Sequence, residues 1–403
     1  MKRILFVDDE PAVLDGLRNL LRKHRRRWDM AFAGGGEAAL AELAARPADV
    51  VVSDMRMPGM DGAELLRRVK AEHPRAVRLI LTGHAEREAI FRALPVAHQF
   101  LSKPCDPEAL ANTIERACEL QLLIHDEALA RVLGGIDSLP SPPGSYWKIT
   151  QALADPAASL QRVGEILLED PVACAKLLQL VNSAYFGLAK PVSDVLHAVS
   201  LLGLEMVRSL ILTAHLLRAT EHAPAVPGFS YQHLHASALL TAKVARRMMG
   251  GGPLAQACFT AGLLHDIGKV VIAMCFPEKF AALLAAAAGE RNFSVAREKE
   301  LLGFTHAEVG AYLLGLWGLP APIVEAAAYH HEPARVAQRG FEVVGCVYVA
   351  DALLRRSVPP TPGVSDDGAS LDVAYLASLG VADRLPEWRA IAAEEARAWG
   401  SPL

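Results

Sequence analysis

The fold is decided by an apolar run that ends in two carboxylates, Ile4-Leu5-Phe6-Val7-Asp8-Asp9. A short continuous apolar run of this kind is typical of a strand buried on both faces of a parallel sheet. Three more such runs occur in the first quarter of the chain, with polar residues after them: 50–52 before Asp54, 79–81 before Thr82, and 100–101 before Lys103. Each predicted strand therefore delivers a chemically useful side chain at its end.

Helical patterns fill the segments between these strands. They cover residues 12–24, 36–45, 62–72 and 86–93, and a further helix starts at residue 107. Alternating strands and helices predict an α/β fold with a doubly wound, parallel five-stranded sheet. Sites in such folds lie outside the carboxyl ends of the strands. We therefore expect the polar side chains at the strand ends to meet there.

The chemistry of these side chains suits phosphoryl transfer to a carboxylate. Clustered carboxylates repel one another unless a hard cation is bound, and Mg²⁺ held by Asp8, Asp9 and Asp54 would meet that need. Lys103 would supply a second positive charge for the transferring group. The hydroxyl of Thr82 could donate a hydrogen bond to the acyl phosphate. The pattern thus predicts an aspartate that accepts a phosphoryl group.

Four motifs in order resemble the receiver domain of bacterial response regulators, over residues 1–122. They are Val-Asp-Asp-Glu-Pro at 7–11, Ser-Asp-Met-Arg-Met-Pro-Gly-Met-Asp-Gly at 53–62, Leu-Thr-Gly at 81–83, and Lys103-Pro104. The resemblance implies a flavodoxin-like sheet, Asp54 as phosphoacceptor, and Thr82, Lys103 and Phe100 as switch residues. It also implies a sensor histidine kinase as partner.

Length and composition indicate more than this one domain. A chain of 403 residues suggests two or three domains at roughly 100 to 200 residues each. Hydrophobic residues make up 52% and charged residues 21%, which supports large buried cores. The six cysteines form no C-x-x-C pair, as expected for reduced thiols in a cytoplasmic protein.

Charge and hydropathy argue against nucleic acid and membrane partners. The net charge is -4, so there is no overall basic field, and no DNA-binding helix-turn-helix motif follows the receiver-like part. The start Met-Lys-Arg indicates no signal peptide. The apolar stretch 196–217 carries charged residues and histidines, so it predicts a core helix and not a membrane span.

A connector helix, residues 123–137, is predicted to continue the helix that begins at Asp106-Pro107. Aspartate is a good N-cap, and proline is tolerated at the first helical position. Apolar residues recur at helical spacing until Gly134-Gly135. The apolar stripe could join two copies in a homodimer or pack on the following domain, and the sequence leaves both alternatives open.

The region 138–355 has helical patterns almost throughout and predicts an all-α domain. A rigid turn at Leu139-Pro140-Ser141-Pro142-Pro143 precedes its helices, and residues 356–403 predict a flexible segment followed by a C-terminal helix. The expected helices are 158–168, 171–182, 192–202, 205–217, 233–249, 254–267 and 308–316.

Histidines and aspartates in this helical region form a series of potential ligands. They are His233, His265, Asp266, His306, His330, His331 and Asp351. Imidazoles and carboxylates together suit iron, manganese or zinc, and two such metals could activate a water against a phosphodiester. A lone core histidine would mean little, because such residues are usually only satisfied polar groups.

Several motifs in this region resemble the HDOD output domain, a relative of HD phosphohydrolases. They are Glu169-Asp170-Pro171, Leu180-Val181-Asn182-Ser183-Ala184-Tyr185-Phe186-Gly187, Ala261-Gly262-Leu263-Leu264-His265-Asp266-Ile267-Gly268-Lys269, Thr305-His306-Ala307-Glu308-Val309-Gly310, Trp317-Gly318-Leu319-Pro320 and His330-His331-Glu332-Pro333. The resemblance implies a mostly non-catalytic signalling module. This chain departs from most members of that family by keeping the ligand residues, and Lys269 could contact a phosphate.

Two features weaken the likeness to hydrolytic relatives. Enzymes that cleave cyclic-di-GMP continue from His-His-Glu into Asp-Gly-x-Gly-Tyr-Pro, whereas residues 333–336 here are Pro-Ala-Arg-Val. The aromatic-x-His spacing selects His233 as the first ligand, yet His235 lies two residues away and points elsewhere on the helix.

The sequence thus supports two interpretations. In the first, phosphorylation of Asp54 controls an HDOD interaction module. The alternative is a regulated, metal-dependent phosphohydrolase for a nucleotide or cyclic dinucleotide, with Lys269 on the phosphate. The kinase, the downstream protein partner, the direction of regulation and the oligomeric state are not fixed by the sequence.

Overall fold

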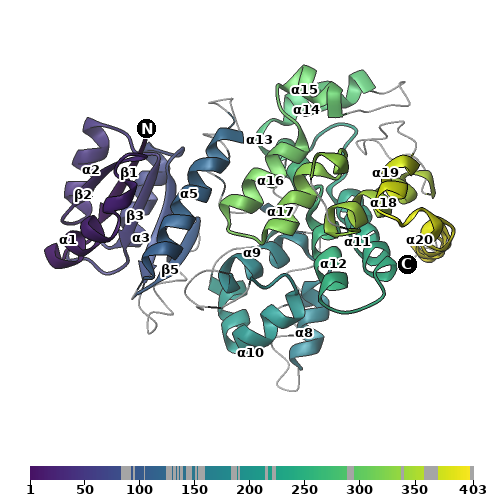
Figure 1. Cartoon of the computed structure of the whole chain (residues 1–403), viewed down its shortest axis with the longest axis horizontal. Coiled ribbons are helices and arrows are strands. Elements are labelled where there is room, and N and C mark those ends of the chain that lie inside the picture. Colours follow the sequence, from purple (N-terminus) through teal and green to yellow (C-terminus); the bar gives the residue numbers. More distant parts are fainter. Residues whose placement is uncertain are drawn as a thin grey trace.

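The computed structural model describes most of the chain. The described residues are 1–82, 92–93, 96–103, 105–123, 129, 133, 136, 139–141, 148–149, 152, 159–182, 188, 191–213, 217–219, 224–287, 295–336, 340–357 and 371–399. Two parts are visible: an amino-terminal sheet with its helices, and a larger helical body (Figure 1).

The amino-terminal part contains the predicted parallel sheet. Its strands are β1 (Lys2–Val7), β2 (Trp28–Ala33), β3 (Val50–Asp54), β4 (Val77–Thr82) and β5 (Gln99–Ser102). They pair in parallel in the order β2-β1-β3-β4-β5. All but the first residue of β1 and every residue of β3 and β4 are buried. Helices cover both faces of the sheet, and this explains why the strands are continuous apolar runs in the sequence.

Four described helices accompany this sheet. They are α1 (Pro11–Leu20), α2 (Gly36–Ala45), α3 (Gly62–Glu72) and α5 (Pro107–Leu123), with a short 3-10 turn, η1 (Arg22–His24), after α1. The side chain of Asp61 caps α3 by accepting a hydrogen bond from the backbone of Glu64 at 2.9 Å. The α/β prediction is confirmed. The predicted helix 86–93 lies outside the described residues, apart from 92–93.

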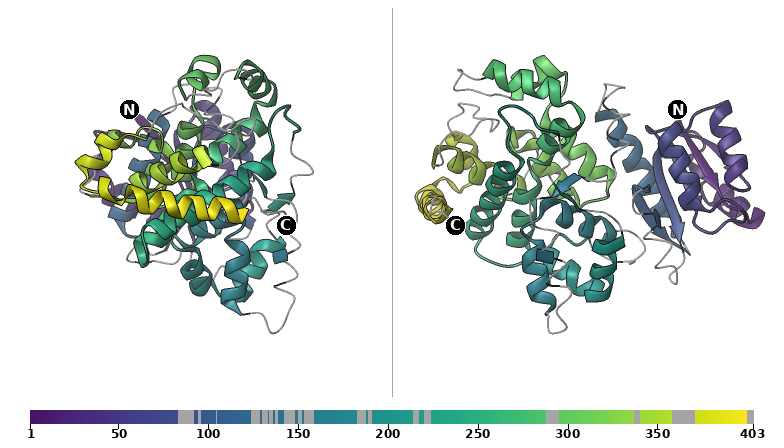
Figure 2. Two further views of the ribbon diagram at one scale, coloured as in Figure 1. Left: turned by 90° about the vertical axis from the view of Figure 1, so that its right-hand side faces the viewer. Right: turned by 180° about the vertical axis from the view of Figure 1, so that it is seen from behind.

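The rest of the chain is helical, as predicted. Its helices are α8 (Leu160–Leu167), α9 (Pro171–Val181), α10 (Val195–Thr213), α11 (Tyr231–Met248), α12 (Pro253–Leu264), α13 (Ile267–Cys275), α14 (Pro277–Ala287), α15 (Val295–Leu302), α16 (His306–Leu316), α17 (Ala321–Tyr329), α18 (Val343–Ser357), α19 (Val373–Ser378) and α20 (Leu385–Trp399). Helix α20 contacts α11 and α18, and it lies at the opposite end of the molecule from the sheet in Figure 1 and in the right-hand view of Figure 2.

Two features of the helical region differ from the sequence prediction. Residues Leu139–Ser141, predicted as a turn, form strand β6, which pairs in parallel with β7 (Leu217–Ala219). The predicted helix 254–267 is interrupted, because α12 ends at Leu264 and α13 begins at Ile267. At the break Asp266 has φ -100° and ψ 11°, so the continuous apolar pattern hides a corner.

Among the described residues, one helical segment, this same pair at Pro253–Cys275, combines great length with an apolar composition. It is long and apolar enough for a membrane span, but 89% of the relevant window is buried inside the protein. That burial is what a core helix of a globular domain requires.

The sheet and the helical body contact each other through β5 and α5 on one side and α9 and α16 on the other. Hydrogen bonds between described residues that cross this contact include Gln99 Nε2 to Leu316 O at 3.1 Å, Arg116 to Leu319 O at 3.1 Å, and Gln179 Nε2 to His98 O at 2.8 Å. The contact therefore involves main-chain groups as well as side chains.

Some sequence predictions fall on residues outside this description. Most of the connector 123–137 and the segment 358–370 are among them. The proposed boundaries at 122, 137 and 355 stay predictions.

Candidate functional site

The carboxyl edge of the sheet brings together two carboxylates and an ammonium group. Asp8 follows β1, Asp54 ends β3 and Lys103 follows β5. Lys103 Nζ lies 2.7 Å from Asp8 Oδ2 and 2.5 Å from Asp54 Oδ1. Both aspartates are buried. The strand order places them side by side because β3 lies between β1 and β4 in the sheet.

The electrostatics of this edge depend on the lysine. Burial raises the pKa of Asp54, an effect that Lys103 opposes and the nearby Asp8 reinforces. Burial lowers the pKa of Lys103, but hydrogen bonds to both carboxylates outweigh this and leave that pKa above its ordinary value. The lysine therefore serves as the counter-charge of a crowded acidic site.

The other predicted residues lie around this edge. Thr82 is the last residue of β4 and is fully buried, opposite Ser102 in the sheet register. Phe100 is buried in β5, beside Ile80. Asp9 follows Asp8 directly and is partly exposed. The structure thus gathers these groups at one edge, while their roles stay predictions.

A second cluster lies in the helical body, at the ends of α12, α13, α16 and α17 and within α18. His265 and Asp266 occupy the corner between α12 and α13, and His306 is the first residue of α16. His330 and His331 follow α17, and Asp351 lies in α18. All are buried except His331, which is partly exposed.

A close helix crossing holds two of these segments together. Gly268 in α13 contacts α16 so tightly that a methyl group there would overlap the carbonyl oxygen of His306 and lie 2.8 Å from Gly310 N. Only a residue without a Cβ atom permits this approach. The glycine therefore places the His265-Asp266 corner next to His306.

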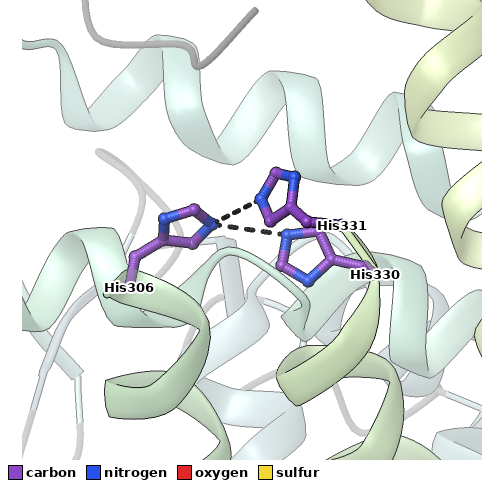
Figure 3. A group of neighbouring side chains, drawn as sticks. All are labelled: His306, His330 and His331. Carbon is purple, nitrogen blue, oxygen red and sulfur yellow. Dashed lines mark hydrogen bonds between the residues drawn. The ribbon is translucent and has the colours of Figure 1, made fainter. Parts of the chain in front are cut away.

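His330 and His331, which follow α17, point their Nε2 atoms at Nε2 of His306, the first residue of α16 (Figure 3). His306 Nε2 lies 3.0 Å from His331 Nε2 and 3.3 Å from His330 Nε2. Tetrahedral bonds of about 2.0–2.1 Å from nitrogen to zinc would place two ligand nitrogens about 3.3 Å apart. The observed spacing therefore fits ligands of a common transition-metal ion.

Hydrogen bonds outside the cluster determine which ring nitrogen faces inward. His265 Nδ1 lies 2.7 Å from Gly262 O, and His330 Nδ1 lies 3.0 Å from Ala327 O. A carbonyl oxygen can only accept, so each Nδ1 carries a proton, and Nε2 is the nitrogen that each ring can offer to a metal. Both rings therefore present a metal-binding nitrogen to the cluster.

Carboxylates complete the donor set. Asp266 Oδ1 lies 3.2 Å from His306 Nε2 and 3.6 Å from His330 Nε2, while Asp266 Oδ2 accepts a hydrogen bond from Lys269 Nζ at 2.7 Å. Two groups of ligand atoms each lie within 4.8 Å of one another: His306, His330 and His331, and His265, His330 and Asp351. Neither group includes His233.

Burial and charge set the protonation of this cluster. Burial lowers the pKa of His330 to about 4. Burial also lowers the pKa of His306, but Glu298 and Asp266 outweigh it and raise that pKa to about 9. The pKa of Asp266 lies well below its ordinary value because Lys269 and the neighbouring imidazoles offset its burial. Imidazoles beside ionised carboxylates are a donor set that suits iron, manganese or zinc.

Two residues of the cluster were not predicted from the sequence. Glu298 in α15 accepts hydrogen bonds from His306, and Arg355 pairs with Asp351 and lies 3.3 Å from His331 Nδ1. Arg355 is four residues after Asp351 on one helix, a spacing that could have revealed it. Glu298 gave no comparable signal.

Comparison with known families identifies both parts of the chain. The model of the response regulator receiver domain matches residues 4–115, and that of the HDOD domain matches residues 139–333. Neither matched model is a DNA-binding domain. The MmoQ response regulator of Methylococcus capsulatus, a solved structure, has 23% identity and a TM-score of 0.48, covering 63% of this chain and 98% of that one.

Curated relatives cover only parts of the chain. An uncharacterized protein of Treponema pallidum is 26% identical over 234 residues, 58% of this chain and 45% of that protein. The transcriptional regulatory protein FixJ of Bradyrhizobium diazoefficiens is 36% identical over 115 residues, 28% of this chain and 55% of FixJ. The chain thus spans about half the length of these relatives. It belongs to the response regulators that join a receiver domain to an HDOD domain.

Proposed function

We propose that a sensor histidine kinase phosphorylates Asp54 in a Mg²⁺-dependent step, and that this controls the HDOD domain as an interaction module. The observation that carries the proposal is the meeting of Asp8, Asp54 and Lys103 at the sheet edge, at 2.7 and 2.5 Å. The matched receiver family uses Mg²⁺ for phosphorylation in general. The proposal places the protein in the cytoplasm, where such kinases deliver phosphate.

The chain's own residues account for the transfer. An Asp54 carboxylate oxygen forms the new bond to phosphorus as the bond from phosphorus to the kinase's histidine nitrogen breaks, and that nitrogen keeps the electron pair. Mg²⁺, held by Asp8, Asp9 and Asp54, would neutralise phosphoryl oxygens. Lys103 supplies a cation beside the acceptor, and Thr82 can donate a hydrogen bond to the acyl phosphate once it forms.

The contact between the two parts offers a route to the output. Lys103 and Phe100 lie in or next to β5, and the neighbouring Gln99 reaches the end of α16. A shift of β5 when Lys103 leaves its carboxylates for the phosphoryl group would therefore act directly on the HDOD domain. Its downstream partner would bind a surface whose exposure depends on this contact.

Phosphorylation by acetyl phosphate tests the proposal. With Mg²⁺, the wild-type protein should gain one phosphoryl group by mass spectrometry, and chelation of Mg²⁺ should prevent the gain. Asp54→Asn should abolish it, whereas Asp15→Asn, which changes an exposed aspartate paired with Arg18, should not. Phosphorylation of the Asp54→Asn variant at the wild-type level would refute the assignment.

We also propose that the histidine cluster of the HDOD domain binds a transition metal, with iron, manganese and zinc as candidates. The observation that favours this is the inward orientation of His306, His330 and His331, with ligand spacing that fits one ion. The matches favour a signalling role over the phosphohydrolase alternative. The metal would then stabilise or switch an interaction module rather than hydrolyse a nucleotide.

Metal analysis of the purified protein tests this second proposal. The wild-type protein and the Asp383→Ala control, which alters an exposed aspartate of the carboxyl-terminal segment, should carry stoichiometric metal, and Asp266→Ala should carry at least tenfold less. No metal in the wild type would end the proposal. Hydrolysis of cyclic-di-GMP by the metal-loaded protein would instead restore the enzyme alternative.

A further inference from the structure

Glu298 is a fully buried carboxylate whose hydrogen bonds within the described part of the chain go to one residue. It lies in α15, and its relative exposure is 0%. Its Oε2 accepts from His306 N at 2.7 Å, and both of its carboxylate oxygens lie 2.8 Å from His306 Nδ1. A buried carboxylate is costly unless it is paired and hydrogen-bonded. His306 is therefore the partner that keeps this charge in the interior.

The bond to Glu298 fixes the orientation and the tautomer of His306. A carboxylate accepts, so Nδ1 of His306 carries a proton, and Nε2 is the nitrogen that faces His330, His331 and Asp266. His265 and His330 also donate from Nδ1, but their acceptors are the main-chain carbonyl oxygens of Gly262 and Ala327. Among the described histidines of the cluster, His306 is thus the one whose outer acceptor carries a full charge.

A charged acceptor does more than hold the ring. A carboxylate behind a ligating imidazole raises the basicity of the opposite nitrogen, and losing such a partner typically reduces metal affinity 10- to 100-fold. The double attachment of Glu298, to the ring and to the main chain of His306, also prevents rotation of the ring. Both effects would act on the nitrogen that lies nearest to the other ligands.

We propose that Glu298 is the positioning residue of the histidine-cluster metal site, holding the Nδ1–H tautomer of His306 and strengthening Nε2 as a ligand. The inference rests on the metal-binding proposal above and adds a residue that belongs to neither group of ligand atoms. The alternative is that Glu298 and His306 form a buried ion pair between α15 and α16 that contributes to folding and has no effect on metal binding.

Replacement of Glu298 by glutamine separates these alternatives. The amide keeps the size of the side chain but removes its charge, and its NH₂ group can donate to Nδ1 and move the imidazole proton to Nε2. The matched control is Glu300→Gln on the same helix, where Glu300 forms an exposed pair with Arg297 at 2.6 Å. Co²⁺ serves as the probe because its visible spectrum reports ligand geometry. Glu298→Asp tests rescue by charge.

The expected result is that wild-type protein and Glu300→Gln bind Co²⁺ equally, while Glu298→Gln binds 10- to 100-fold more weakly with an altered visible spectrum. Glu298→Asp should recover part of the affinity. In the metal-free protein at a pH above the His306 pKa of about 9, where the ring is neutral, the ¹⁵N shifts of His306 should move from the Nδ1–H form in the wild type towards the Nε2–H form in Glu298→Gln. This readout does not respond to a folding defect alone.

Two results would overturn the inference, and they differ. Wild-type Co²⁺ affinity and spectrum in Glu298→Gln would reject the positioning role while leaving the metal site intact. Failure of the wild-type protein itself to bind Co²⁺ would reject the metal site, and with it this role. Thermal unfolding of each metal-free variant identifies any loss of affinity that follows from unfolding.

Discussion

Burial makes His235 a pH-sensitive residue of the helical body. Its relative exposure is 6%, and neither of its ring nitrogens has a hydrogen-bond partner among the described residues. Burial lowers its pKa to about 4, so the folded protein keeps this ring neutral at a pH where the unfolded chain has already bound a proton. The stability that depends on the neutral ring is complete above about pH 6.5 and is lost as the pH falls towards 4.

A leucine at this position should remove the effect. For the wild type, this single group should lower the free energy of unfolding by about 1 kcal/mol between pH 7.5 and pH 5.5. In urea titrations at the two pH values, the decrease in the free energy of unfolding should be about 1 kcal/mol smaller for His235→Leu than for the wild type. His197→Leu, at an exposed histidine of α10, is the control and should keep the wild-type decrease. An identical decrease in both variants would mean that His235 is not the titrating group.

The sequence could identify ligand candidates, but not all their partners. His265, His306 and His330 stand in recognisable motifs, and the structure brings them together. His233, selected by spacing, belongs to neither group of ligand atoms. Glu298 was missed because its partner lies eight residues away across a turn, and a glutamate in a polar stretch gives no sign of burial. Contacts of this kind are set by tertiary packing.

At the scale of secondary-structure elements, the crossing of α13 and α16 decides whether the cluster forms. Gly268 of α13 contacts the main chain of α16 at His306 and Gly310. A side chain at this point must push the helices apart, because the atoms it meets are backbone. The same movement would carry the His265-Asp266 corner away from His306.

Gly268→Ala should therefore be strongly destabilising. We expect a loss of about 2 kcal/mol or more in the free energy of unfolding, measured by urea titration, together with weaker metal binding. Gly16→Ala is the matched control, since a methyl group there meets nothing within 4 Å in α1, and it should stabilise by about 0.5–1 kcal/mol. Equal stability of the two variants would refute the close crossing.

Secondary structure was predictable where the pattern of apolar residues was unambiguous. The buried strands β1, β3 and β4 follow from continuous apolar runs. The corner at Asp266 did not, because the apolar pattern of the flanking segments continues through it. Strands β6 and β7 have three residues each, which is too short for an alternating pattern to appear.

At the scale of the whole molecule, composition and motifs predicted two parts but not how they meet. The contact depends on side chains such as Gln99, Arg116 and Gln179, which reach main-chain oxygens across it. Polar residues that bond to main chain far away in sequence leave no periodic signal. Gln179 is the most informative, because it is 2% exposed in α9, and its Oε1 also accepts a hydrogen bond from Lys176.

Gln179 should couple the receiver domain to the HDOD domain, because its bond to His98 O lies one residue from β5. Gln179→Leu removes this buried hydrogen bond, which should weaken the contact by about 1 kcal/mol. In hydrogen-exchange mass spectrometry, treatment with acetyl phosphate and Mg²⁺ should change the exchange of α9 in the wild type and change it several-fold less in Gln179→Leu. Gln161→Leu, at an exposed glutamine of α8, should respond like the wild type. If α9 responds fully in Gln179→Leu, the signal reaches the HDOD domain by another route. Phosphorylation of the receiver does not itself depend on this contact, so it is expected in both proteins.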